Sequence, residues 1–164
     1  MTDPLDEFTQ QLQNQIYTEA EKMYGPVVFE RWRTPLHMGR LEAPDGYGRI
    51  TGSCGDTMQI FLKFENDRVR QASFITDGCG TSTVCGSFAA ELSLGKNPDD
   101  ILLVTGETIL KILGDLPEEE RHCAFLAAET LQAAVADYLQ NQVSDLSRRG
   151  TAPEETGRTE SPNQ

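Results

Sequence analysis

Three short segments of the chain carry residues that can bind metal. Cys54-Gly55-Asp56, Gly78-Cys79-Gly80 and His122-Cys123 hold three of the four cysteines, one of the two histidines and a carboxylate. Thiolate, imidazole and carboxylate groups are ligands of tetrahedral zinc, and thiolates hold iron–sulfur clusters. No two of these cysteines form the C-x2-C pair of a zinc finger, so the fold must bring the segments together. The sequence therefore predicts one metal site assembled by tertiary structure.

The candidate ligands differ in chemistry. Cys79 lies between two glycines, where a strand should give way to a helix whose positive end favours a thiolate. His122 and Cys123 are neighbours on an expected helix, and adjacent helical side chains point about 100° apart. We therefore expect one of these two to be a weaker or alternative ligand. Asp56 is a hard donor beside soft thiolates, so it should bind a cluster loosely and leave it easily.

The same residues also have structural interpretations. Cys54 and Cys79 could be small buried hydrophobes, and Asp56 could be a turn residue between strands. His122 could be a surface histidine beside the acidic run Glu118–Glu120. Cys85 follows Cys79 by six residues. We expect Cys85 to be a buried small hydrophobe. The competing hypothesis is an auxiliary thiol that accepts persulfide sulfur or forms a disulfide with Cys79 under oxidation.

An amphipathic helix is expected in residues 1–26. Apolar residues recur there at three- and four-residue steps, at Leu5, Phe8, Leu12, Ile16, Ala20 and Met23. The pattern begins near Asp3-Pro4 and ends at Gly25-Pro26. We expect the apolar face to pack against the domain, with partner docking or dimerisation as the alternative. A second short helix over 27–33 should end before Pro35, because the residue before a proline resists helical geometry.

Period-two alternation of apolar residues predicts strands from about residue 47 to residue 76. The segments 58–64 and 72–76 flank an Asn66-Asp67 turn and form a hairpin, and a third strand lies near 48–53. The helical period returns after Gly80, in segments that end near residues 95, 104 and 114 and in a last helix that begins near Pro117. Strands followed by helices predict an α+β fold, in which C-terminal helices cover one face of a small antiparallel sheet of about three strands.

Composition limits the class of protein. A chain of 164 residues with 38% hydrophobic residues can form one domain with a core. The formal net charge of -12 argues against nucleic acid as a partner, because phosphates attract clustered Lys and Arg. No apolar stretch is long enough to span a membrane, and the N-terminus lacks the layout of a signal peptide. We expect a cytoplasmic protein with free thiols and no membrane association.

The chain divides into three expected regions. The N-terminal amphipathic helix occupies residues 1–26, and one domain occupies residues 27–142. After residue 142 the sequence loses its apolar content and consists mainly of Ser, Thr, Pro, Gly and charged residues. We therefore expect a disordered tail over residues 143–164.

Longer motifs around the candidate ligands resemble a known family. The runs Gly52-Ser53-Cys54-Gly55-Asp56-Thr57-Met58, Thr76-Asp77-Gly78-Cys79-Gly80 and Arg121-His122-Cys123-Ala124 are similar to the iron–sulfur cluster assembly scaffolds, IscU and the N-terminal domain of NifU. Upstream, Arg33-Thr34-Pro35-Leu36-His37-Met38-Gly39 and Ala43-Pro44-Asp45-Gly46-Tyr47-Gly48 resemble the family's N-P-R-N-x-G and P-D-G-x-G segments. The resemblance covers roughly residues 27–138.

The resemblance implies a function and a set of partners. Members of this family are scaffolds, not enzymes: they build a transient [2Fe–2S] cluster from iron and desulfurase-derived sulfur and pass it to acceptor apoproteins. The implied ligands are Cys54, Asp56, Cys79 and Cys123, with His122 also associated with cluster or zinc binding. The implied partners are a cysteine desulfurase and the acceptors. The donor set suits both zinc and iron, so the isolated protein could hold zinc. The sequence leaves open whether the chain forms a homo-oligomer.

Two alternative functions and one departure from the family remain. The first alternative is a SufU-like sulfurtransferase, in which the same residues bind zinc and a freed thiolate carries persulfide. The second is a structural zinc module.

The departure concerns a chaperone motif. IscU members carry the segment Leu-Pro-Pro-Val-Lys before the His-Cys pair, and a dedicated DnaK-class chaperone recognises this segment. Here the segment is Leu116-Pro117-Glu118-Glu119-Glu120, so acids replace the last three residues. Recognition by that chaperone is therefore doubtful.

Overall fold

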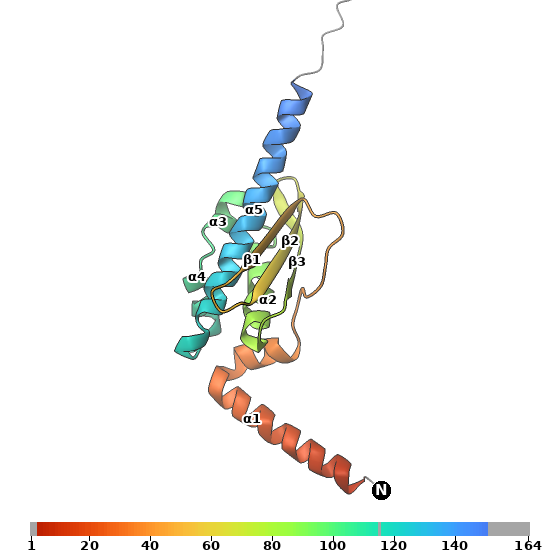
Figure 1. Cartoon of the computed structure of the whole chain (residues 1–164), viewed down its shortest axis with the longest axis vertical. Helices are drawn as coiled ribbons and strands as arrows, with labels where there is room; N and C mark the ends of the chain where they lie inside the picture. Colours follow the sequence, from red (N-terminus) through yellow and green to blue (C-terminus); the bar gives the residue numbers. More distant parts are fainter. Residues whose placement is uncertain (1–2, 115, 151–164) are drawn as a thin grey trace, which may run out of the picture.

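The computed structural model describes residues 3–114 and 116–150, and its sheet forms where the sequence alternates. Strands β1 (Gly46–Thr51), β2 (Thr57–Glu65) and β3 (Arg68–Thr76) form an antiparallel sheet in the order β1-β2-β3. Asn66 and Asp67 both have positive φ, at 52° and 60°, as a tight hairpin turn requires. The predicted hairpin, third strand and α+β fold are confirmed (Figure 1).

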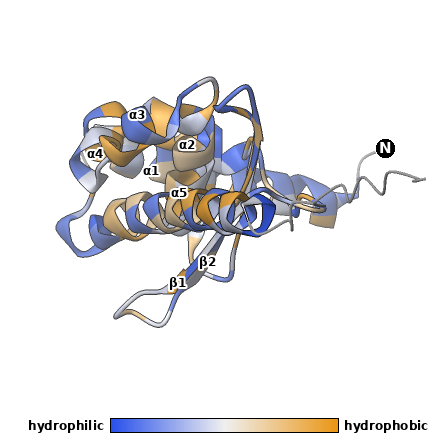
Figure 2. Cartoon of the chain, turned by 90° about the horizontal axis from the view of Figure 1, so that it is seen from above, coloured by the Kyte–Doolittle hydropathy of each residue, from blue (hydrophilic) through white to orange (hydrophobic). Residues whose placement is uncertain are grey.

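Helices cover one face of this sheet. Helices α2 (Gly80–Ser93) and α5 (His122–Arg149) contact the strands, and α3 (Pro98–Leu102) and α4 (Gly106–Leu113) pack against α5. A short 3-10 helix, η1 (Glu118–Glu120), precedes α5. Fully buried sheet residues such as Ile60 and Phe74 form one core with Val84 of α2 and Leu131 of α5. Hydrophobic residues occur in bands along α2 and α5 (Figure 2). This packing fixes the start of α2 and the start of α5 relative to the sheet.

A glycine lets β1 approach α5 closely. A Cβ atom on Gly48 would overlap the backbone of α5 at the carbonyl oxygen of Thr130. Only a residue without a side chain fits there, so Gly48 holds the helix and the strand at backbone contact. The last helix is thereby anchored along the edge strand of the sheet.

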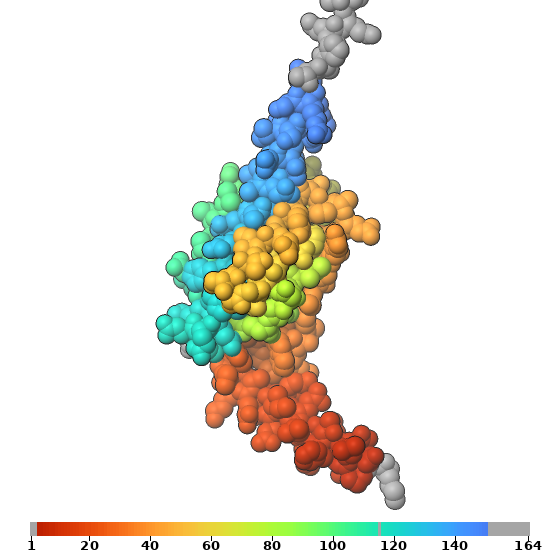
Figure 3. Space-filling view, viewed as in Figure 1, coloured from red at the N-terminus to blue at the C-terminus, as the bar shows by residue number. Residues whose placement is uncertain are grey.

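The N-terminal helix is present but does not pack as expected. Helix α1 (Pro4–Arg33) is capped by the Asp3 side chain, which accepts a hydrogen bond from the Leu5 N–H, and it is kinked at Gly25, where φ is 79°. The predicted break at Gly25-Pro26 is therefore confirmed. The expectation that the apolar face packs on the domain is wrong for the helix before the kink, because Leu5 and Phe8 are 68% and 62% exposed. The start of α1 extends away from the domain (Figure 3), and contact with the core begins at Tyr24, just before the kink, and continues at Val28.

The C-terminal region also differs from the prediction. Helix α5 continues to Arg149, so the predicted disorder from residue 143 is wrong for residues 143–149, whereas residues 151–164 lie outside the described residues. A helix already nucleated by packing extends at little cost per residue even without a core to cover, and Leu146, Arg148 and Arg149 are good helix formers. Within the described ranges, no helix combines the length and the apolar character needed to cross a bilayer.

Candidate metal site

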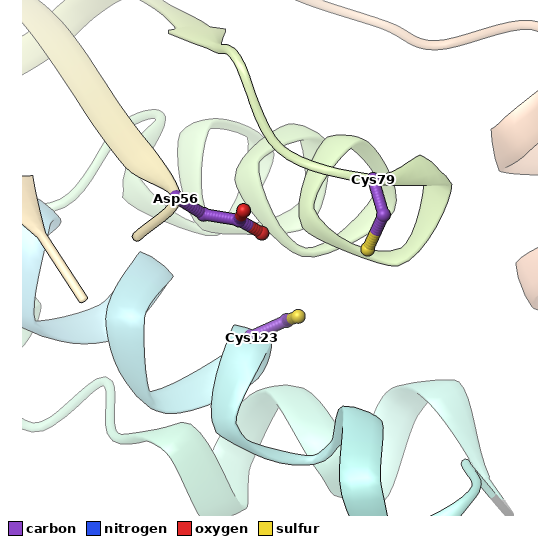
Figure 4. A group of neighbouring side chains, drawn as sticks. All are labelled: Asp56, Cys79 and Cys123. Carbon is purple, nitrogen blue, oxygen red and sulfur yellow. The ribbon is translucent and has the colours of Figure 1, made fainter. Parts of the chain in front are cut away.

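Three predicted ligands meet at one end of the sheet. The ligand atoms of Asp56, Cys79 and Cys123 all lie within 4.8 Å of one another (Figure 4). Asp56 directly precedes β2, Cys79 is the N-cap of α2, and Cys123 lies in the first turn of α5. The structure thus brings together one residue from each of the three segments. Their side chains point into a common space between the loop and the two helix starts.

The turn before β2 is held by backbone hydrogen bonds. The N–H of Gly52 donates to the carbonyl oxygen of Asp56 at 2.8 Å, and Gly55, with φ of 90°, donates to the carbonyl oxygen of Gly52 at 3.0 Å. At the start of β2, next to this turn, the Thr57 N–H donates to Oδ1 of Asp77 at 2.6 Å. This bond joins the Asp56 turn to the loop that carries Cys79.

Cys79 is an exposed thiol at a helix start. Its backbone is extended, with φ of -70° and ψ of 179°, and its carbonyl oxygen accepts the first helical hydrogen bond from the Thr83 N–H. The thiol therefore lies at the N-terminus of the fourteen-residue helix α2. Of the three gathered ligands, Cys79 is the one that an external reagent reaches most easily.

Cys123 is buried and holds its proton tightly. Its side chain is 1% exposed, and burial raises the pKa of the Cys123 thiol to about 11, while a hydrogen bond with Ser82 acts in the opposite direction. A metal binds the thiolate, so it must displace this proton. Metal affinity at this site should therefore rise with pH.

His122 stands beside the three ligands. Its Nδ1 lies 2.7 Å from the carbonyl oxygen of Glu119, and because a carbonyl only accepts, Nδ1 carries the proton of that bond. The lone pair of a neutral ring is then on Nε2, which lies 3.6 Å from Cys123 Sγ. Metal-binding histidines commonly donate their second N–H to a carbonyl in this way. His122 is thus a candidate for an additional ligand through Nε2, although it is outside the group within 4.8 Å.

The remaining two cysteines have different surroundings. Cys54 is exposed and is not part of the gathered group. A Cβ built on Gly52 would lie 3.5 Å from Cys54 Sγ and 3.4 Å from Leu126, so Gly52 lies close to both this thiol and α5. Cys85 is fully buried in the core, and burial raises the pKa of its thiol well above the usual range. The prediction that Cys85 is a buried small hydrophobe is confirmed.

Sequence reasoning missed two features of the site. Ser82 is fully buried, and its hydroxyl contacts the ligand side chains; its signal in the sequence is the three-residue spacing from Cys79, which places both residues on one helix face. Glu120 accepts hydrogen bonds from the hydroxyls of Thr81 and Tyr24, the latter at 2.9 Å, and this bond raises the pKa of the Tyr24 phenol. The second contact ties α1 to the segment before Cys123.

An apolar cavity of about 240 Å³ lies beside Cys79. Aromatic side chains of α1, including Tyr24, Phe29 and Trp32, form much of its lining, with Val84 of α2 opposite. The indole of Trp32 also packs against Gly80, where an added Cβ would lie 2.7 Å from Nε1. The last turns of α1 therefore form one wall of the surroundings of Cys79.

Comparison with known sequences gives consistent matches. Residues 23–145 match the profile described as the NifU-like N terminal domain. The chain is 34% identical over 119 residues to the iron-sulfur cluster assembly scaffold protein IscU 1 of Archaeoglobus fulgidus, covering 72% of this chain and 78% of that protein. It is 35% identical over 122 residues to the protein of the same description, IscU, from Aquifex aeolicus, covering 73% and 78% of the two chains.

A larger relative and a solved structure complete the comparison. The chain is 36% identical over 118 residues to the nitrogen fixation protein NifU of Azotobacter chroococcum, covering 70% of this chain and 38% of that protein. Among solved structures, an iron-sulfur cluster assembly scaffold described for the SUF system of Fervidobacterium islandicum superposes with a TM-score of 0.59 at 18% identity, covering 70% of this chain and 98% of that one. At this identity the structural match shows a shared fold.

Proposed function

The chain belongs to the NifU-like N-terminal domain family, and from this premise we propose that it is a scaffold on which an iron–sulfur cluster is assembled and then passed to acceptor proteins. The scaffold itself performs no catalysis. The observation that carries the proposal is the convergence of Asp56, Cys79 and Cys123 within 4.8 Å. Two thiolates with a carboxylate, beside an imidazole, form a donor set that suits iron in a sulfide cluster.

The cargo of this site is a [2Fe–2S] cluster, which needs four protein ligands. Cys79, Cys123 and Asp56 supply three of them. The fourth is Cys54, brought in by rearrangement of the exposed turn, or His122 through Nε2. Support for Cys54 comes from its place in the turn that carries Asp56, two residues before that ligand; support for His122 comes from the 3.6 Å distance between Nε2 and Cys123 Sγ.

The exposure of the ligands suits a carrier that loads and unloads. A cysteine desulfurase delivers sulfur as a persulfide, and an external thiol or other two-electron reductant converts this sulfur to sulfide. Cys79 is accessible to such partners whereas Cys123 is not. Asp56 is half-buried and is a hard donor in a soft set. Asp56 therefore binds the cluster weakly, and a ligand from the acceptor protein can displace it easily.

Anaerobic reconstitution tests the proposal. The protein is mixed with iron, cysteine and a cysteine desulfurase, the visible absorption of the cluster is followed, and an apo-ferredoxin is then added. The wild-type chain should assemble a cluster and transfer it. Asp56→Ala should retain a cluster and release it more slowly, roughly tenfold, because the weak ligand that opens the exit route is gone.

The controls separate this function from its alternatives. Cys123→Ser should lose cluster retention, whereas Cys85→Ala, which removes a core thiol outside the ligand set, should assemble a cluster normally. Transfer from Asp56→Ala as fast as from the wild type would contradict the role given to this carboxylate. A chain that binds zinc tightly, accepts persulfide and never forms a cluster would instead support the SufU-like sulfur carrier.

A further inference from the structure

We propose that Ser82 is a positioning residue that orients the Asp56 carboxylate for metal binding. The inference rests on the proposed function, because it concerns the same ligand set. Ser82 lies in the first turn of α2, three residues after Cys79, and its side chain is fully buried. No motif in the sequence and no feature of the comparisons assigns a role to this hydroxyl.

The hydroxyl of Ser82 contacts all three gathered ligands. Its Oγ lies 2.9 Å from Oδ2 of Asp56, 3.4 Å from Sγ of Cys123 and 3.8 Å from Sγ of Cys79. A buried hydroxyl without a partner is unfavourable, so its partners indicate why it is there. In the described part of the chain, every hydrogen-bond partner of Ser82 Oγ is a candidate ligand.

A neighbouring serine shows that this arrangement is specific. Ser93 is also fully buried on α2, but its Oγ donates at 2.7 Å to the carbonyl oxygen of Ala90 in its own helix. That bond is the common way for a helical serine to satisfy its hydroxyl. Ser82 instead directs its hydroxyl out of the helix and into the ligand group.

The single proton of Ser82 goes to Asp56. A hydroxyl has one O–H donor, so it cannot donate fully to two acceptors at once. The carboxylate is the closer acceptor, at 2.9 Å against 3.4 Å for Cys123 Sγ, and an ionised acceptor forms the stronger bond. With Oδ2 engaged in this way, Oδ1 of Asp56 remains for the metal, and the carboxylate has one preferred orientation.

Gly78 lies directly against the hydrogen-bonded pair of Asp56 and Ser82. A Cβ on Gly78 would lie 2.5 Å from Oδ2 of Asp56 and 2.7 Å from both Cβ and Oγ of Ser82. The absence of a side chain at residue 78 thus makes room for the Asp56–Ser82 contact. The carboxylate is held between a buried donor and a glycine surface, an arrangement that preorganises a ligand.

Zinc affinity tests the inference without requiring a cluster. Zinc alone is titrated against a chromophoric chelator for the wild type, Ser82→Ala, Asp56→Ala and the double variant. Loss of a hydrogen bond to a metal ligand typically weakens binding by about 10- to 100-fold, and we expect a loss in this range for Ser82→Ala. Ser93→Ala is the matched control, since it removes a buried hydroxyl from the same helix and should leave zinc affinity unchanged.

The double variant distinguishes positioning from a general structural role. If Ser82 acts through Asp56, Ser82→Ala should weaken zinc binding in the wild-type chain and have almost no further effect in Asp56→Ala. Equal losses in both backgrounds, or wild-type affinity in Ser82→Ala, would overturn the inference. Cobalt(II) absorption on the same variants checks that both thiolates still bind.

A second variant covers the case in which Ser82→Ala does not fold. Asp56→Glu keeps the carboxylate but moves it by one methylene from Ser82, and its zinc affinity should fall at least about tenfold if orientation matters. Wild-type affinity in Asp56→Glu, or a wild-type chain that binds no zinc, would also overturn the inference. A chain that binds zinc as described but transfers no cluster would overturn the proposed function alone.

Discussion

Substitution of Gly78 by alanine should weaken metal binding more than it destabilises the fold. The backbone at Gly78 does not require positive φ, so any cost comes from the added methyl group. That Cβ would lie 2.5 Å from Asp56 Oδ2, whereas ordinary contact begins at 3.4 Å, so one partner must move by the difference of 0.9 Å. The same Cβ would lie 2.7 Å from Cβ and Oγ of Ser82, which is fully buried on α2, so residue 78 and the half-buried turn that carries Asp56 must both shift.

The size of the effect follows from this displacement. Metal–ligand distances tolerate deviations of about 0.2 Å, so the carboxylate should lose its place in the coordination shell. We expect zinc affinity to fall by about 10- to 100-fold. Overpacking of a core costs about 1–3 kcal/mol, and Gly78→Ala should lie at the lower end because the turn can shift.

The assay is zinc competition together with urea unfolding of the metal-free protein. Gly52→Ala is a control in the same region, since its Cβ would meet Leu126 and Cys54 at 3.4–3.6 Å, in ordinary contact. It should keep both stability and zinc affinity. Gly78→Ala with wild-type zinc affinity would refute the reasoning that Asp56 is held against Gly78 when metal binds.

Three further predictions concern the thiols and the segment before α5. Cys85→Ala should lower the unfolding free energy by about 1–2 kcal/mol, because it leaves a small cavity in the core; a loss of persulfide uptake would instead favour the auxiliary-thiol hypothesis. The raised pKa of Cys123 favours its protonated form in the folded state, so metal-free protein should lose about 2–3 kcal/mol as pH rises from about 9 to about 11. Urea titrations across this range should show a smaller loss for Cys123→Ser. A peptide spanning 116–123 should bind a DnaK-class chaperone weakly, because acids occupy residues 118–120; saturable binding equal to a Leu-Pro-Pro-Val-Lys control would contradict this.

The fold was largely predictable because its signals are local. The Asn66-Asp67 turn, the glycine at residue 80 and the return of the helical period mark the hairpin and the helices that follow it. Errors arose where local pattern and packing disagree. The apolar stripe of α1 has the spacing of a core-facing helix, yet the start of α1 extends away from the domain (Figure 3). Residues 143–149 have little apolar content, yet they extend a helix that packing elsewhere has nucleated.

For the site, the residue types and their order along the chain were enough to nominate the ligands. A thiol, a carboxylate and an imidazole have intrinsic preferences for metals, and these do not depend on the fold. The amino-acid sequence alone therefore determined which groups this protein offers to a metal. The sequence pattern of its strands and helices also determined the fold class, α+β, that carries these groups.

Only the tertiary structure decided how those groups meet. It gathered Asp56, Cys79 and Cys123 and left Cys54 exposed on the turn. It also placed the Ser82 hydroxyl among the ligands, whereas the hydroxyl of Ser93 on the same helix bonds to its own backbone. The physical reason is that distances between residues far apart in the chain depend on how the sheet and its helices pack, and side-chain hydrogen bonds and burial follow from those distances.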